Sequence, residues 1–207
     1  IFYNEDELRY LCKIALNLWI YEFINKNTEI FFSAHREDKI INFKNHCLFS
    51  YIGYLVESGI HWTYKFRQQS GLLFRQLFSP ETISFQKIEK CNNEGGAVIF
   101  LDVFIGSGTT GYDFWRGLPS QIHEKFPLLD MYYISLVGLS TGINIIKTRT
   151  EFKVLCPIVL NKDQRVFHAS SKFFTDNEEK VHAKQISRHY GTILEGARSE
   201  EHTSELQ

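Results

Sequence analysis

The sequence has little of several features that identify specialised proteins. Its 207 residues contain only four cysteines, four prolines and one methionine, and the formal net charge is only -1. The cysteines form no C-x-x-C pair and are irregularly spaced, which argues against a zinc site or a dense disulfide framework and favours reduced thiols in a cytoplasmic protein. Lysine and arginine are scattered among acids, so no basic patch indicates a nucleic acid or an anionic membrane as partner.

Long hydrophobic runs are also lacking. The longest uncharged run near the N-terminus covers residues 14–21. A bilayer-spanning helix needs about 20 apolar residues, so we expect no membrane span. The only methionine is Met131, so we expect the sequence to begin within a longer protein. Residues 198–207 resemble translated adapter sequence, and we expect them to be an artefact that lies outside the fold.

The remaining sequence predicts two regions, a helical N-terminal region over residues 1–45 and an α/β domain over residues 46–197. Asn4 and Glu7 predict a capping box at the start of the first helix. Apolar runs predict strands over 48–56, 97–101, 131–137 and 153–160. Helical patterns over 30–44, 110–125, 140–147 and 176–190 accompany them, with a division at Gly117–Pro119 and a stop at Gly191. Alternating strands and helices predict a mostly parallel sheet flanked by helices.

One segment carries the strongest functional signal. The apolar run over 97–101 is followed by Asp102 and then by a loop of small and hydroxylated residues, which consists of Gly106, Ser107, Gly108, Thr109 and Thr110. A strand that enters a helix through such a turn gathers backbone N–H groups that bind anions. In parallel sheets this position is the carboxyl end of the strand, where ligands bind. The loop therefore predicts a phosphate or nucleotide site.

Four classes of phosphate or nucleotide site use a loop of this kind. A Walker-type loop requires a lysine that is missing between Gly106 and Asp113. A dinucleotide site fits G-x-G-x-x-G literally, but Asp102 would repel a pyrophosphate, and the next strand ends without the acid that holds the ribose. The third class is the S-adenosylmethionine-dependent methyltransferases. Residues 102–110 of this chain resemble the cofactor-binding loop of that class. The Pro-Pro-aromatic catalytic loop of that class is missing, since all four prolines are isolated. This alternative stays open beside the fourth.

The fourth class is the phosphoribosyltransferases. Residues 98–110 resemble their signature, which has four apolar strand residues, two adjacent acids, two apolar residues and a loop that ends in Gly-x-Thr. The one departure is Val103, which replaces the second acid. Residues 132–138, Gly142, 166–167 and 187–191 resemble the phosphoribosyltransferase-like family PRTase-CE of prokaryotic conflict and antiphage loci. The resemblance covers residues 45 to 195, and only the loop motif in it is specific.

The resemblance implies a type I phosphoribosyltransferase fold that binds phosphoribosyl diphosphate or a nucleotide-like small molecule. It implies that Asp102 is the catalytic carboxylate, contacting the ribose hydroxyls or a Mg²⁺ ion, and that residues 106–110 hold the 5′-phosphate. It further implies that Glu57, Ser58 and Gly59, after the first strand, grip the pyrophosphate. The expected activity is a Mg²⁺-dependent phosphoribosyltransferase, and we also consider a homodimer. Val103 leaves three alternatives open: weakened catalysis, a ligand sensor without turnover, or a sequence error.

Overall fold

The computed structural model describes residues 4–52, 58–164, 166–169, 171 and 173–195. Its centre is a parallel sheet of five strands whose main path has the order β1-β2-β3-β4, with β5 also paired to β3. The strands are β1 (Leu48–Tyr51), β2 (Ala97–Ile105), β3 (Asp130–Leu139), β4 (Lys153–Leu155) and β5 (Ile158–Leu160). The predicted α/β class with a parallel sheet is therefore confirmed.

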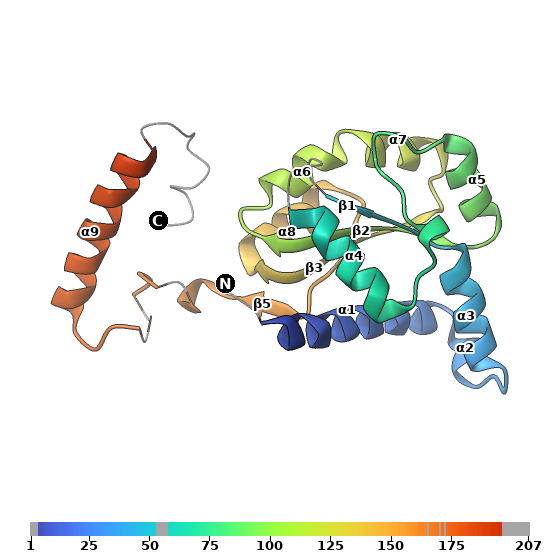
Figure 1. Cartoon of the computed structure of the whole chain (residues 1–207), viewed down its shortest axis with the longest axis horizontal. Coiled ribbons are helices and arrows are strands. Elements are labelled where there is room, and N and C mark those ends of the chain that lie inside the picture. Colours follow the sequence, from blue (N-terminus) through green and yellow to red (C-terminus); the bar gives the residue numbers. More distant parts are fainter. Residues whose placement is uncertain (1–3, 53–57, 165, 170, 172, 196–207) are drawn as a thin grey trace.

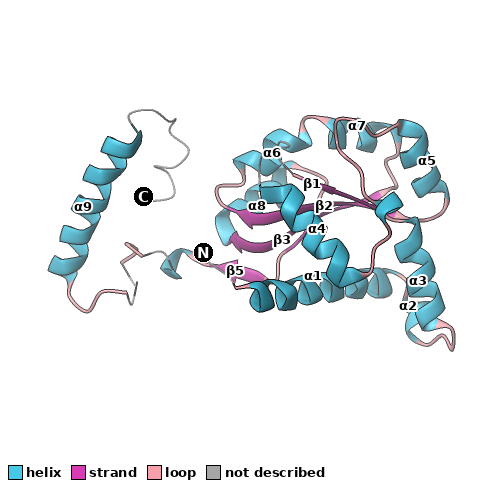
Figure 2. Cartoon of the chain, viewed as in Figure 1, coloured by secondary structure: helices cyan, strands magenta, loops and turns pink. Residues whose placement is uncertain are grey.

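Helices cover both faces of the sheet (Figures 1 and 2). On one face lie α1 (Glu5–Lys26), α3 (Arg36–His46) and α4 (Ser58–Ser70). On the other lie α5 (Phe85–Asn93), α6 (Thr109–Trp115), α7 (Leu118–Lys125) and α8 (Ser140–Arg149). The shorter elements are α2 (Thr28–Phe31) and the 3-10 turns η1 (Phe74–Gln76) and η2 (Lys162–Gln164).

The central strand β2 explains why two apolar cores form. Successive side chains of a strand point to opposite faces, so an uninterrupted apolar run supplies both layers. Ile99 and Leu101 join the core beneath α1 and α4, whereas Val98 and Phe100 join the core beneath α5 to α8. All four side chains have no exposed surface. The same alternation sends Asp102 toward the second face.

The N-terminal helix α1 packs directly on the sheet. Its predicted capping box is present, since Asn4 accepts from the backbone N–H of Glu7 at 2.9 Å and Glu7 accepts from that of Asn4 at 2.8 Å. Trp19 is fully buried, and its ring lies 5.3 Å from that of Phe49 on β1. At the end of α1, Lys26 Nζ donates to Asp130 Oδ2 at 2.7 Å, which ties the helix to the start of β3.

Several element boundaries differ from the sequence predictions. The first strand, predicted over 48–56, ends at Tyr51, and Ser58 and Gly59 already belong to α4. The helix predicted over 30–44 is two helices, α2 and α3. The division predicted at Gly117–Pro119 is confirmed, because α6 ends at Trp115 and α7 begins at Leu118.

The predicted strand over 153–160 is interrupted at Cys156 and Pro157, so that β4 and β5 pair with different parts of β3. Proline has no N–H to donate to a strand ladder, which explains the break.

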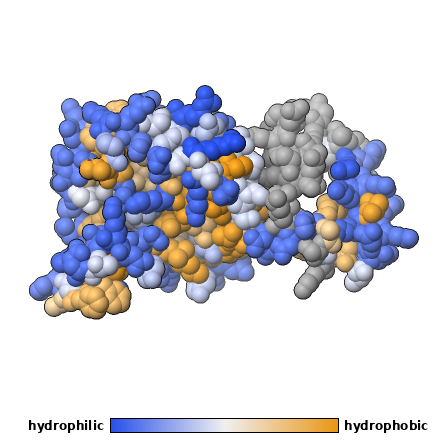
Figure 3. Space-filling view, turned by 180° about the vertical axis from the view of Figure 1, so that it is seen from behind, coloured by the Kyte–Doolittle hydropathy of each residue, from blue (hydrophilic) through white to orange (hydrophobic). Residues whose placement is uncertain are grey.

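The C-terminal helix α9 (Asn177–Glu195) stands apart from the layers (Figure 1). It continues through Gly191, so the predicted stop there was wrong. Gly191 does not adopt the positive φ that ends helices at glycine, and nothing lies within 4 Å of a Cβ added to it. A second projecting part is the end of α2, where Phe32 is 87% exposed and apolar surface is visible (Figure 3). None of the helices within the described ranges has the length and apolar character needed to cross a bilayer.

Candidate functional site

The loop after β2 lies at the carboxyl edge of the sheet, between β2 and α6. Gly108 is the N-cap of α6 and has φ +88°, a left-handed backbone conformation that residues other than glycine rarely adopt. The first N–H groups of a helix have no intrahelical acceptor. The sequence prediction of a glycine-rich strand-to-helix turn at this position is therefore correct in its local geometry.

The loop also packs closely against the start of α8. A Cβ added to Gly142 would lie 2.1 Å from the backbone oxygen of Gly106, and one added to Gly108 would lie 2.6 Å from the backbone oxygen of Gly142. Only the absence of side chains at both positions allows this approach. The N-terminal ends of α6 and α8, which follow the neighbouring strands β2 and β3, are thereby held side by side.

The hydroxyl groups of the loop face outward. Ser107, Thr109 and Thr110 are all exposed. Ser107 Oγ donates to Thr109 Oγ1 at 3.0 Å, and the backbone N–H of Thr109 donates to Ser107 Oγ at 3.3 Å. These bonds pre-arrange the loop, and its accessible hydroxyls can reorient toward an anion.

Asp102, the sixth residue of β2, is partly buried and held in one orientation by hydrogen bonds. Its Oδ2 accepts from the Tyr133 hydroxyl at 2.5 Å, and its Oδ1 accepts from the backbone N–H groups of Val103 at 2.7 Å and Phe104 at 3.4 Å. Burial, followed by the charge of Asp102 and the hydrogen bond to it, raises the pKa of Tyr133 well above its ordinary value. Tyr133 therefore remains a proton donor to the carboxylate at neutral pH.

The fit of Asp102 to a magnesium ion depends on the number of carboxylates nearby. Within the described residues, no cluster of three or more His, Cys, Asp or Glu side chains is arranged to hold a metal ion. Mg²⁺ in nucleotide sites commonly uses one or two carboxylates, with phosphates and water completing its shell. Asp102 thus fits an ion that is carried mainly by a phosphorylated ligand.

Val103, the residue that departs from the two-acid signature, packs against the core on the α1 and α4 face. It is half-buried. A carboxylate placed there would lose water contact against apolar neighbours, which is costly without a partner. The valine is therefore compatible with its surroundings in this fold.

The residues expected to grip pyrophosphate are described only in part. Glu57 lies outside the described residues. Ser58 and Gly59 are the first residues of α4, and the Ser58 side chain is likewise not described. The parallel strands β1 and β2 pair with each other, so Tyr51, at the end of β1, lies at the same carboxyl edge as the loop after β2.

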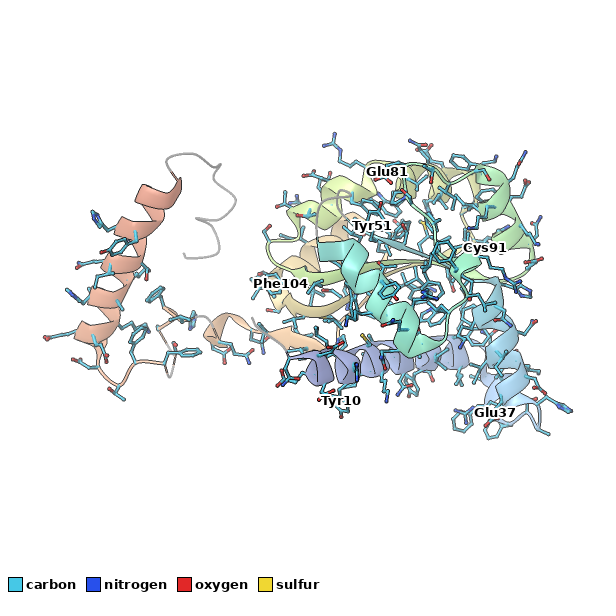
Figure 4. The ribbon with its side chains drawn as sticks, viewed as in Figure 1. Tyr10, Glu37, Tyr51, Glu81, Cys91 and Phe104 are labelled. Atoms are coloured by element: carbon cyan, nitrogen blue, oxygen red, sulfur yellow. The ribbon has the colours of Figure 1, made fainter. Side chains whose placement is uncertain are left out.

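A hydroxyl and carboxylate cluster beside this edge was missed by the sequence reasoning. The Tyr51 hydroxyl, at the end of β1, lies 3.2 Å from Ser79 Oγ and donates to Glu81 Oε2 at 3.2 Å (Figure 4). Ser79 also donates to Glu81, and this hydrogen bond is the main cause that lowers the pKa of Glu81.

The cluster forms because residues next to Ser79 run parallel to β1, where Leu77 bridges Phe49. That long-range pairing left no signal in the sequence.

Comparison with known proteins shows which family this chain resembles. The model of the family PRTase-CE matches residues 1–202. A comparison with curated proteins finds no match. Among solved structures, the Helicobacter pylori xanthine-guanine-hypoxanthine phosphoribosyltransferase is similar to this chain with 13% identity and a TM-score of 0.33, over 81% of this chain and 94% of that chain. At that identity and TM-score, the likeness carries no argument about function.

Proposed function

This chain belongs to the PRTase-CE family, and from that premise we propose that it binds phosphoribosyl diphosphate, or a related nucleotide phosphate, at the carboxyl edge of β2. The observation that carries the proposal is the loop over residues 106–110. It combines a left-handed glycine, exposed hydroxyls and a helix start directly after the central strand. Backbone N–H groups and hydroxyls in such a turn bind phosphate oxygens.

In this proposal the loop takes the 5′-phosphate and Asp102 contacts the ribose hydroxyls. The hydrogen bonds from Tyr133 and from the backbone of Val103 orient that carboxylate before the ligand arrives. Pre-orientation reduces the ordering cost of binding. A Mg²⁺ ion bound with the ligand would neutralise part of the diphosphate charge, with Asp102 as its protein contact. The segment of Glu57, Ser58 and Gly59 would meet the pyrophosphate end.

Catalysis requires more than binding. Displacement of pyrophosphate from C1 of the ribose passes through an oxocarbenium-like state, and the protein stabilises the charges that develop. A specific observation favours a second candidate, a ligand sensor without turnover. Val103 replaces the second acid of the signature and is packed against the apolar core. The two candidates share one binding site and differ in whether pyrophosphate is released. A role in prokaryotic conflict systems, with either candidate, is part of the same proposal.

Calorimetric titration of phosphoribosyl diphosphate with Mg²⁺ tests the site. Thr109→Val removes an exposed loop hydroxyl, and we expect it to weaken binding about tenfold, the loss of one hydrogen bond to a charged group. Thr148→Val is the matched control, because Thr148 lies on α8 and its hydroxyl bonds only to backbone oxygens of its own helix. Unchanged affinity in both Thr109→Val and Asp102→Asn would defeat the proposal. Binding of S-adenosylmethionine in place of phosphoribosyl diphosphate would assign the methyltransferase alternative.

Pyrophosphate release separates the enzyme from the sensor. Wild-type protein is mixed with the ligand, Mg²⁺ and candidate acceptor bases, and released pyrophosphate is measured. Release in the wild type supports a transferase, and Asp102→Asn then serves as the inactive control. Tight binding without release, in the wild type and in Val103→Asp alike, supports the sensor.

A further inference from the structure

A cavity of about 520 Å³ lies at the amino edge of the sheet, away from the loop after β2. Figure 4 labels Cys91, which lines the cavity, and Phe104, near the end of β2, at opposite ends of the sheet. The cavity opens to solvent and is bordered by the end of α3, η1, α5 and the start of β1. Its lining residues are Asn42, Asn45, His46, Cys47, Leu48, Arg75, Gln76, Lys87, Lys90, Cys91 and Glu94.

The charged side chains of this cavity are mostly positive. Arg75, Lys87 and Lys90 line it with a single acid, Glu94. Lys90 lies 3.8 Å from Glu94, which is also 3.8 Å from His46 Nε2. Neither Arg75 nor Lys87 forms an ion pair with a carboxylate among the described residues. Arg75 and Lys87 are therefore two lining cations that no carboxylate of the described residues neutralises.

The position of Lys87 is unfavourable for a cation without a partner. It is the third residue of α5, whose N-cap is Ser84, and the N-terminus of a helix repels positive charge. The ammonium is also partly buried, and this desolvation lowers the pKa of Lys87. Its ammonium donates a hydrogen bond of 3.3 Å to the backbone oxygen of Leu77. By contrast, Lys90 is in the last turn of α5, where the dipole favours a cation, so it requires no ligand to explain it.

Between these charged side chains, the cavity is lined by neutral groups that the fold holds in place, among them Gln76 and Cys91. Gln76 is 2% exposed, its Oε1 accepts from the backbone N–H of Leu73 at 2.8 Å, and its Nε2 donates to the backbone oxygens of Lys44 at 2.5 Å and Cys47 at 3.3 Å. Burial raises the pKa of the Cys91 thiol to about 12, so the thiol is neutral. A preformed polar hollow of this kind limits the ordering cost of binding.

His46 adds an unpaired polar atom to this lining. Its Nδ1 is buried and has no hydrogen-bond partner in the described part of the chain. A buried polar group is costly unless it is hydrogen-bonded, so a polar ligand beside it would be favourable. The exposed side-chain amides of Asn42, one turn before His46 on α3, and of Asn45, directly before it, offer further donors and acceptors.

We propose that this cavity is a second binding site, which takes a small phosphorylated molecule with its phosphate between Arg75 and Lys87. The guanidinium fork of arginine matches two phosphate oxygens, and the lysine ammonium adds a point charge. The rest of the ligand lies along the side chains of His46, Asn42 and Asn45. The site is separate from the loop after β2, so it does not depend on the function proposed there.

Calorimetric titration with AMP and with inorganic phosphate, at low ionic strength, tests the proposal, with adenosine as the neutral probe. We expect AMP and phosphate to bind and adenosine to bind at least tenfold more weakly than AMP. Arg75→Gln and Lys87→Gln should each weaken AMP binding about tenfold. The matched control is Lys13→Gln, an exposed lysine of α1, which should bind AMP as the wild type does. Thermal unfolding of each variant shows that it is folded, which is expected because neither Arg75 nor Lys87 is fully buried.

Three results would overturn the second site. One is no binding of AMP or phosphate by the wild type at millimolar concentration. Another is equal binding of AMP and adenosine. The third is AMP binding that is lost in Thr109→Val but kept in Arg75→Gln and Lys87→Gln, which would assign the nucleotide to the loop after β2. Conversely, failure of phosphoribosyl diphosphate to bind, with AMP binding lost only in the Arg75 and Lys87 variants, would reject the loop site and keep this one.

Discussion

The two ends of the parallel sheet are built in different ways. At the carboxyl edge, the loop after β2 meets α8 through glycine backbones, with Gly142 held against Gly106 and Gly108. At the amino edge, long charged side chains surround a cavity, and Arg75 and Lys87 lie on its wall. Backbone packing leaves the loop after β2 little tolerance for added atoms. At the amino edge Gly96 is also closely packed, since a Cβ added to it would lie 2.3 Å from the backbone oxygen of His46, but Arg75 and Lys87 are not fully buried and tolerate exchange.

Because of this difference, we expect the two edges to bind anions through different groups. An anion at the carboxyl edge would be bound mainly by N–H groups and hydroxyls, which composition does not reveal. An anion at the amino edge would be bound mainly by charged side chains, whose affinity falls as salt rises. Strand β3 spans both edges, since it begins at Asp130 and ends at Leu139. Substitutions along it therefore compare the two ends directly.

The largest effect is expected where backbones touch. Gly142→Val would place side-chain atoms against the backbone oxygen of Gly106, 2.1 Å from the added Cβ. We expect the free energy of unfolding to fall by about 3 kcal/mol, as for severe overpacking. Denaturant unfolding measures this change. The control is Gly191→Ala, where an added Cβ has nothing within 4 Å and the helix should gain up to about 1 kcal/mol. A Gly142→Val protein as stable as the wild type would contradict the close packing.

An intermediate effect is expected at Tyr133, whose hydroxyl reaches Asp102 from the first half of β3. Tyr133→Phe removes the donor to Asp102, and we expect a loss of about 2 kcal/mol at pH 8, typical of a hydrogen bond to a charged group. The pKa of Tyr133 is raised in the folded state, so its contribution is complete below pH about 10 and is lost as pH rises toward the folded pKa.

The stability difference between wild type and Tyr133→Phe should therefore shrink above pH about 10. Chemical unfolding between neutral and alkaline pH follows it, and Tyr10→Phe, at an exposed tyrosine of α1, is the control. A difference that grows with pH would show that Asp102 and Tyr133 are not coupled as described.

The smallest effect is expected at the amino edge, where side chains can adjust. Asp130 accepts from Lys26 at 2.7 Å and from Lys153 at 2.8 Å. Burial raises the pKa of Asp130, but the hydrogen bonds from the two lysines outweigh it, and the net pKa lies below the ordinary 3.8. Asp130→Asn should cost about 1 kcal/mol at pH 7, less than a full charged hydrogen bond because the amide oxygen still accepts.

This stabilisation is complete above the unfolded pKa of Asp130 and is lost as pH falls through the lower folded value. Urea unfolding of wild type and Asp130→Asn at neutral and acidic pH should show the difference vanish in acid. Asp163→Asn, at an exposed aspartate of η2, should behave as the wild type does at both pH values. A difference of the same size in acid would exclude the charge of Asp130 as its cause.

Local signals in the sequence were sufficient for much of the fold. The capping box of Asn4 and Glu7, the buried strand β2 and the division near Pro119 depend on residues a few positions apart, and all three are confirmed. A prediction failed where one residue type is compatible with two backbone conformations. Gly191 was read as a helix stop, but glycine also remains helical when its φ is negative.

The candidate site likewise has a part that the sequence predicted and a part that it did not. The order of residues 97–110 along the chain was enough to predict a strand, an acid and a glycine-rich loop before a helix, because these features follow one another along the chain. The partners of those residues come from elsewhere. Tyr133 reaches Asp102 from β3 through the strand register, and Glu81 meets Tyr51 because Leu77 bridges Phe49.

By itself, the sequence determined most of the helices and strands, that the sheet is parallel, and where the glycine-rich loop after β2 lies. Only the tertiary structure decided that Gly142 would close on that loop, that Tyr133 would hold Asp102, and that Arg75 and Lys87 would line one cavity. The physical reason is distance along the chain. Propensity and periodicity act over a few residues, whereas these contacts require separate elements to pack on a common sheet, and packing depends on all of their side chains at once.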